Sequence, residues 1–224
     1  MCYSFRTSLL SFTLAFLSGI YALSTGQYVL GMLILAYSLV QLSECMIWYG
    51  IDTGSELYNR MGTFLGKYSL PTHTIAIGLG ILIGLHFHGH TLKWTNYVPL
   101  ISGIVLFIVV VSCVYKKTDN ALTYPSDPSC KDRSCQNNNN RLQWPYQTSW
   151  YAISFLLSIL ILTYYIYPKS SLMLIVLSFI ITYVLFIHIF KQDNGSVWCF
   201  SAAVLAPVLV LINGYLIKDV KFFT

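Results

Sequence analysis

The sequence has few charged residues: Asp, Glu, Lys and Arg make up only 9% of its 224 residues. Soluble globular domains carry about 25% charged residues, so this scarcity excludes an ordinary soluble fold. The hydrophobic share is 56% and the mean hydropathy is +0.64. These values are typical of a chain embedded in a lipid bilayer.

The chain also lacks a cluster of basic residues before its first apolar run, where only Arg6 is found. A secretory signal peptide needs such a cluster and a small-residue cleavage site followed by a mature domain, and neither is recognisable. We therefore interpret the first run as a membrane span. No internal repeat is recognisable either, which disfavours the transporter folds that are built from repeats.

No lysine lies inside an apolar run, which excludes a retinal Schiff base of the kind found in seven-span rhodopsins. Only one acidic residue lies inside a run, whereas a membrane zinc hydrolase would be expected to place several acidic ligands there. An enzymatic role is therefore not favoured, and the identity of any cofactor is left open.

Long apolar runs cover most of the chain, and most of them approach the ~20 residues that a helix needs to cross the hydrocarbon core. The predicted fold class is therefore all-α, a polytopic transmembrane helical bundle with about seven spans, forming a single domain over residues 1–224. The runs are Leu9–Leu23, Tyr28–Tyr49, Leu70–Phe87, Tyr97–Tyr115, Trp150–Tyr167, Leu172–Phe190 and Val197–Ile217.

Two connections between the runs differ in composition. Residues 51–69 are moderately polar and predict a short interfacial helix around Leu57, Met61, Phe64 and Leu65. The loop 116–147 is polar, with three prolines and a run of asparagines. Such a composition packs poorly, so we expect a flexible insert between the fourth and fifth spans.

The basic residues are distributed unequally between the two faces of the predicted bundle. An excess of Lys and Arg favours the cytoplasmic side, so we expect a cytoplasmic N-terminus. In that orientation Cys130 and Cys135 are cytoplasmic and reduced, whereas the opposite orientation makes them a plausible disulfide. The richer face holds Arg6, Arg60, Lys67, Lys116, Lys117, Lys131, Arg133, Arg141 and Lys191.

This loop bias accounts for the net charge of +5, so the charge does not indicate nucleic-acid binding. The expected partner is the lipid bilayer. A homo-oligomer is left open.

Glu44 is the only acidic or basic side chain inside an apolar run. An ionisable group at membrane depth costs at least ~2.5 kcal/mol, and it usually has a partner or a function. Tyr37, Gln41, Glu44 and Trp48 follow one another at steps of four, three and four residues, so a helix places them on one stripe. The helical rise puts Glu44 about 9 Å from the end of its run.

Further polar side chains are expected at the same end of the bundle, because consecutive spans alternate in direction. Arg6 precedes the first run and His73 opens the third. Either can pair with the Glu44 carboxylate, and Gln41 and Trp48 can donate hydrogen bonds to it. We therefore predict an ion-binding or solute-binding site formed by Glu44, Gln41, Trp48, His73 and Arg6.

A histidine triplet at the other end of the third run suggests a second kind of site. If the helix continues through it, His86 and His90 share one face at a spacing that can hold a metal ion, whereas His88 points elsewhere. The alternative interpretation is a hydrated interfacial segment. A haem would need facing histidines at similar depth, and His73 and His188 match best.

The chain opens with Met1–Ser4 (Met-Cys-Tyr-Ser), and Gln41–Trp48 has the form Gln-x-x-Glu-x-x-x-Trp. These stretches resemble a family of uncharacterised small multi-pass membrane proteins, mostly bacterial. The family pattern usually has a second Gln and a Gly where this chain has Val40 and Cys45. The resemblance carries no activity with it, but it implies that Cys2 belongs to the same site as Glu44. The asparagine run and the Tyr-rich and Ile-rich composition also resemble proteins of large DNA viruses.

The sequence leaves three functions open. The first is a conduit for protons, ions or a small solute, with Glu44 as its protonatable group. The second is a structural or assembly protein of a cellular or viral membrane, in which the polar residues only hold helices together. The third is a membrane protein that binds a metal ion or haem.

Overall fold

A computed structural model describes residues 4–115, 121–125, 142–145, 153–154, 156–158 and 194–217. Within these ranges the protein is helical apart from one pair of two-residue strands, which confirms the all-α class. The elements are α1 (Phe5–Ser24), α2 (Tyr28–Thr53), α3 (Glu56–Ser69), α4 (Thr72–Phe87), the 3₁₀ turn η1 (Trp94–Tyr97), α5 (Val98–Tyr115), β1 (Tyr124–Pro125), β2 (Leu142–Gln143) and α8 (Asn194–Ile217).

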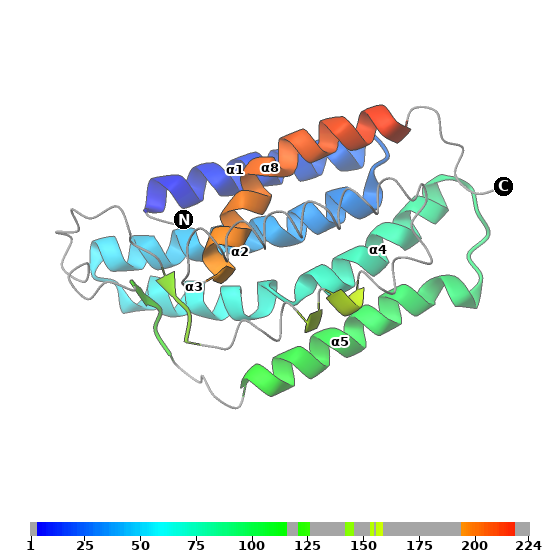
Figure 1. Ribbon diagram of the computed structural model, residues 1–224. Coiled ribbons are helices and arrows are strands. Elements are labelled where there is room, and N and C mark those ends of the chain that lie inside the picture. Colours follow the sequence, from blue (N-terminus) through cyan, green and yellow to red (C-terminus); the bar gives the residue numbers. More distant parts are fainter. Residues whose placement is uncertain are drawn as a thin grey trace.

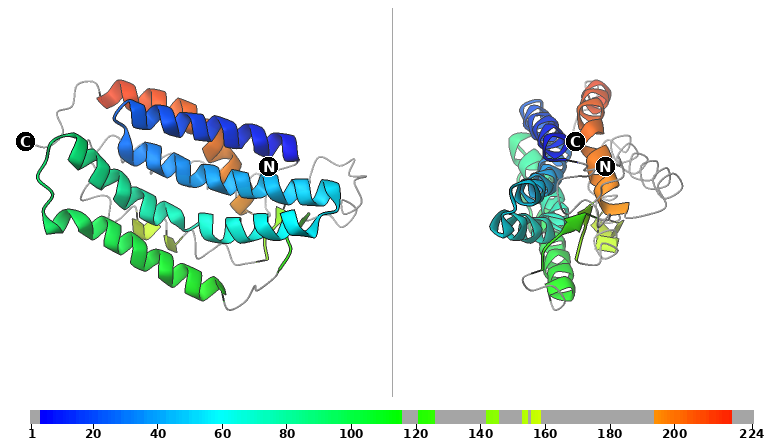
Figure 2. Two further views of the ribbon diagram at one scale, coloured as in Figure 1. Left: turned by 180° about the vertical axis from the view of Figure 1, so that it is seen from behind. Right: turned by 90° about the vertical axis from the view of Figure 1, so that its left-hand side faces the viewer.

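Helix α2 lies at the centre of the bundle and contacts α1, α3, α4 and α8 (Figure 1). Helices α1 and α2 form an antiparallel hairpin, and α3 and α4 run end to end along the opposite side of α2. Helix α5 returns antiparallel to α4. The end-on view in Figure 2 shows α1 and α8 at one edge of the bundle and α5 at the other.

Local signals in the sequence set the ends of the first two helices. The Ser4 hydroxyl accepts a hydrogen bond from the Thr7 N–H at 3.3 Å and so caps the start of α1. Gly26 has a φ of 80° in the turn between the helices, and Gly54 ends α2 with a φ of 70°. Glycine adopts this left-handed conformation without a steric penalty. As a result α2 continues four residues beyond the predicted run, and Glu44 lies ~14 Å from its end.

The long helices approach one another closely where glycines face a neighbouring backbone. A Cβ on Gly62 of α3 would lie 2.7 Å from Ile47 Cγ1, and a Cβ on Gly80 of α4 would lie 2.6 Å from Val29 Cα. Both distances are too short for real Cβ contacts. Small residues therefore let α3 and α4 pack directly against α2, as in many membrane helix pairs.

The bundle is arranged with large apolar side chains outside and small or polar side chains inside. In α1, Leu10 and Leu17 are 62% and 60% exposed, whereas Ser8 and Ser11 are 0% and 1% exposed. Helix α3 repeats the pattern: the apolar residues predicted for an interfacial helix, Leu57, Met61 and Phe64, are exposed, and Asn59, Thr63 and Lys67 are buried. A helix of a water-soluble protein has the reverse arrangement. The observed one is compatible with an integral membrane location.

The number of spans is only partly supported. Among the described residues, three helical segments are long and apolar enough to cross a membrane, namely Phe5–Ser24, Tyr28–Thr53 and Trp94–Cys113. Helices α3 and α4 meet at an angle of 53° and can count together as a fourth, broken span. The predicted run Leu70–Phe87 thus corresponds to α4, which begins at Thr72, and the short helix predicted around Leu57–Leu65 corresponds to α3.

The remaining predicted runs are covered unevenly. The runs Trp150–Tyr167 and Leu172–Phe190 lie outside the described residues, except for 153–154 and 156–158. The last run forms α8, which contains Pro207, and its apolar part Ala203–Tyr215 is shorter than a full span. Seven spans therefore remain a prediction.

Two pieces of the loop 116–147 pack against α3. Strands β1 and β2 pair in antiparallel fashion, with Tyr124 opposite Gln143. The Asn59 side chain donates to the Thr123 carbonyl at 2.8 Å and accepts from the Thr123 N–H at 3.0 Å. The hydroxyls of Thr63 and Thr123 are 2.7 Å apart. These described pieces of the loop are therefore fixed to the bundle.

Candidate functional site

Four side chains of α2 form one buried polar stripe, made of Tyr37, Gln41, Glu44 and Trp48. Gln41 and Glu44 are 0% exposed, Trp48 is 4% exposed and Tyr37 is 7% exposed. The helical spacing predicted that these residues share a face, and the structure places all four inside the bundle.

The polar stripe faces neither α1 nor α3. Ser43 and Ile47 lie against the glycines of α3, while Gly31 and Leu35 lie against Gly19 of α1. At 3.6 residues per turn, these two faces and the polar stripe are each separated by about a third of a turn. The stripe therefore points to a third side of α2.

On that third side the described residues enclose both ends of the polar stripe. Tyr37 shares an apolar cluster with Ala203, Ala206 and Val210 of α8. Trp48 shares another cluster with Leu142, which belongs to β2. Gln41 and Glu44 lie between these ends along α2. The carboxyl group is therefore enclosed by protein and does not lie against acyl chains or bulk solvent.

The break between α3 and α4 lies beside the polar stripe. The rings of Tyr37 and His73 are stacked, with centroids 6.0 Å apart and an interplanar angle of 17°. His73 Nδ1 is hydrogen-bonded to the Leu70 carbonyl. A carbonyl can only accept, so Nδ1 carries the proton and Nε2 of the neutral ring is an acceptor. Tyr37 precedes Glu44 by seven residues of α2. His73, which lies beside Tyr37, is therefore ~10 Å from the Glu44 position when measured along the α2 axis.

Some buried polar atoms lack a hydrogen-bond partner in the described part of the chain, among them Ser8 Oγ, Ser43 Oγ and Trp48 Nε1. Ser43 Oγ faces α3, 2.7 Å from where a Cβ on Gly66 would stand, next to the ring of Trp144. An unsatisfied buried donor or acceptor costs ~1–3 kcal/mol. Such atoms are where an ordered water or a polar ligand binds most readily.

The structure does not bring every predicted residue to this site. Arg6 is exposed in the first turn of α1, whereas Glu44 is 0% exposed. Cys2 and His188 lie outside the described residues, as do Cys130 and Cys135.

The prediction that His86 and His90 share one face of a helix is wrong. Helix α4 ends at Phe87, and Gly89 with a φ of 73° turns the chain away before His90. The two histidines therefore do not share a helical face. Among the residues that the structure describes, no group of three His, Cys, Asp or Glu could hold a metal ion.

Sequence reasoning missed the polar face of α3. Lys67 was counted as a loop charge, but it is 6% exposed, with its ammonium nitrogen 5.9 Å from the centre of the Tyr68 ring. A signal was present, because Asn59, Thr63 and Lys67 recur every four residues. That spacing places them on one stripe of a helix, opposite the apolar residues.

The described geometry thus combines an enclosed carboxyl group, polar side chains on the same stripe and buried polar atoms on the neighbouring helices. The expected resemblance to small multi-pass membrane proteins rests on two short motifs and stays a prediction. No protein-family model matches the chain, and neither a curated protein nor a solved structure is significantly similar to it.

Proposed function

We propose that the protein is an integral membrane bundle of about seven spans that conducts protons, small ions or a small polar solute through a site centred on Glu44. The observation that carries this proposal is the position of Glu44, an acidic side chain that is 0% exposed in the middle of the apolar helix α2. A charge in such a place is costly to retain and usually serves a function.

The embedding in a membrane is supported by the exterior of the bundle. Three described helical segments are long and apolar enough to span a bilayer, and α1, α5 and α8 all expose large aliphatic side chains. Lipid tails solvate such side chains, whereas water does not. The polar stripe then lies among protein side chains at membrane depth.

The chemistry of the stripe fits a transported proton or cation. A carboxyl group can carry a proton or balance a positive charge, and the Gln41 amide can both donate and accept. Trp48 Nε1 is buried and lacks a partner among the described residues, so it is available to a water or solute. The broken span α3–α4 adds irregular backbone beside Tyr37, which membrane proteins tolerate where it lines a polar site.

The topology belongs to the same proposal. The excess of basic residues places the N-terminus and the loop 116–147 in the cytoplasm. Cys130 and Cys135 are then reduced thiols. A membrane-impermeant maleimide should label them only after cells are permeabilised, and labelling of intact cells would reverse the orientation.

The decisive experiment compares flux through proteoliposomes for Glu44→Gln and for Glu56→Gln. The first change removes the buried carboxyl group, and the second makes the same chemical change at a side chain that is 70% exposed and paired with Arg60. Proton and alkali-cation flux should fall at least tenfold in Glu44→Gln and stay unchanged in Glu56→Gln. Equal flux in both variants, or no flux above empty liposomes for the wild type, would exclude the conduit.

A structural or assembly role is the second candidate, and two buried contacts favour it. The Asn213 amide donates to Gln27 Oε1 at 2.9 Å, which ties α8 to the start of α2. Asn59 holds Thr123 in the same way. Polar side chains therefore join segments within this bundle. If the Glu44 site does only this, Glu44→Gln will lower thermal stability, and no wild-type flux will be found.

A further inference from the structure

The connection between α4 and α5 is an ordered turn at one end of the bundle. The His88 N–H donates to the Gly84 carbonyl at 3.1 Å and the His90 N–H donates to the Leu85 carbonyl at 3.0 Å, which closes the last turn of α4. The Lys93 N–H then donates to Asn96 Oδ1 at 2.7 Å and starts η1. The side chains of this turn are therefore presented from a defined backbone.

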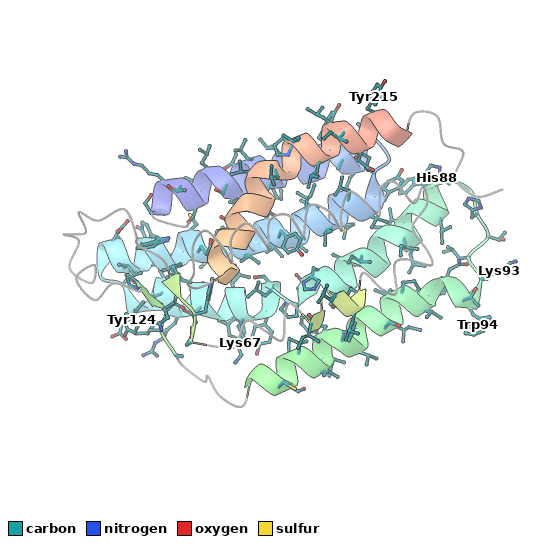
Figure 3. The ribbon with its side chains drawn as sticks, viewed as in Figure 1. Lys67, His88, Lys93, Trp94, Tyr124 and Tyr215 are labelled. Atoms are coloured by element: carbon teal, nitrogen blue, oxygen red, sulfur yellow. The ribbon has the colours of Figure 1, made fainter. Side chains whose placement is uncertain are left out.

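Large aromatic side chains are exposed at this end. Trp94 is 79% exposed, Phe87 68% and Tyr215 of α8 77%. Figure 3 shows Trp94, Lys93, His88 and Tyr215 at the same end of the bundle. The Phe87 ring is stacked on Tyr28, with centroids 5.4 Å apart. Exposed Trp and Tyr rings at the ends of apolar helices prefer the boundary between headgroups and acyl chains.

Among the described residues, this end carries no acidic side chain. Lys93 and His86 are exposed, and the sequence has no Asp or Glu in α1, η1, α4, α5 or α8. Lys218, Asp219 and Lys221 follow α8 and lie outside the described residues. The described polar groups around the aromatic rings therefore include a lysine ammonium group and hydrogen-bond donors, which complement an anion.

We propose that this turn binds the phosphate of an anionic phospholipid. The Lys93 ammonium pairs with the phosphate, an imidazole N–H of His86 donates to one of its oxygens, and the Trp94 and Phe87 rings insert just below the headgroup. The proposal rests on the proposed membrane location, but it is independent of conduction at Glu44. Lysine binds phosphate as a compact point charge, so one side chain is sufficient for a preference.

The test measures quenching of Trp94 fluorescence by lipids brominated just below the headgroup. Full-length protein is reconstituted into bilayers in which the brominated lipid is either phosphatidylglycerol or phosphatidylcholine. The Trp94 signal is the difference between the wild type and Trp94→Phe. Lys93→Gln removes the proposed ligand, and Arg60→Gln removes one positive charge from a side chain that is 52% exposed on α3.

Brominated phosphatidylglycerol should quench Trp94 in preference to phosphatidylcholine. The preference should fall roughly fivefold in Lys93→Gln, because one basic residue at an anionic surface is worth ~1 kcal/mol. The Arg60→Gln variant should show the same preference for phosphatidylglycerol as the wild type. Added inorganic phosphate should not abolish this preference. Equal quenching by the two lipids, an unchanged preference in Lys93→Gln, or displacement by free phosphate would overturn the lipid site. Absence of quenching by any brominated lipid would instead refute the membrane location itself.

Discussion

Replacing Gly80 by alanine should destabilise the protein, whereas the same replacement at Gly84, one turn further along α4, should not. A Cβ on Gly80 would lie 2.6 Å from Val29 Cα and 2.9 Å from the Tyr28 carbonyl oxygen. Both atoms belong to the α2 backbone, so no side-chain rotation relieves the clash. A Cβ on Gly84 would meet the Tyr28 ring at 3.4 Å, which is ordinary van der Waals contact.

Apart from these contacts, the two substitutions should have the same effect on the free energy of unfolding. Alanine is favoured over glycine inside a helix by ~1 kcal/mol, and this gain is the same at both positions. Overpacking against a backbone typically costs ~1–3 kcal/mol. Gly84→Ala should therefore be neutral or stabilising, and Gly80→Ala should be ~1–3 kcal/mol less stable than Gly84→Ala. At this chain length, each kcal/mol corresponds to about 2–4 °C in Tm.

Thermal unfolding of both variants in the same detergent, followed by circular dichroism, measures this difference. Helix content before unfolding is the control for correct folding. If Gly80→Ala unfolds at or above the temperature of Gly84→Ala, the close contact between α4 and α2 does not exist as described.

Three further predictions concern the polar contacts. Asn59→Ala removes both hydrogen bonds to Thr123 and should lower the free energy of unfolding by ~2 kcal/mol in a denaturant titration. Single alanine substitutions of Gln27 and Asn213 should be less than additive, and a double-mutant cycle should give a coupling near the ~0.6 kcal/mol usual for such pairs in membranes. Ser43→Ala removes a buried hydroxyl whose unsatisfied oxygen costs ~1–3 kcal/mol, so it should raise the free energy of unfolding; an unchanged or lower value would mean that Ser43 Oγ has a partner.

The stripe on α2 could be predicted from the sequence because it depends only on helical spacing. Gln41, Glu44 and Trp48 are fixed relative to one another once the run Tyr28–Tyr49 is helical. Their enclosure could be predicted only in part. The cost of a charge in lipid requires that Glu44 be covered, but α8 and Leu142, which meet the ends of the stripe, come from distant parts of the chain.

Hydropathy located the junction between α3 and α4 only approximately. Leu70 and Pro71 are apolar and were assigned to the third run, whereas α4 begins at Thr72. Proline lacks the N–H needed inside a helix but is tolerated where one begins. The Thr72 and Thr74 hydroxyls donate to the carbonyls of Ser69 and Pro71 at 2.5 and 2.8 Å, which supports the irregular backbone.

The error at His90 has a different origin. The i, i+4 rule for metal ligands assumes a continuous helix, and the sequence alone does not show which glycine ends it. Gly84 continues α4, whereas Gly89, five residues later, takes a φ of 73° and ends it. The difference lies in the tertiary environment, because Gly84 packs against Tyr28 and a Cβ at Gly89 would meet nothing within 4 Å.

The pairing of Tyr124 with Gln143 has a practical consequence for anyone who wishes to label this protein. Pro125 and Leu142, which flank the segment 126–141, are paired with each other, so lengthening that segment adds only a small closure entropy. An epitope or a small fluorescent domain inserted there should leave the helices in place. Because the insertion emerges on one side of the bilayer, antibody access to it would report the sidedness of the whole chain without altering either terminus.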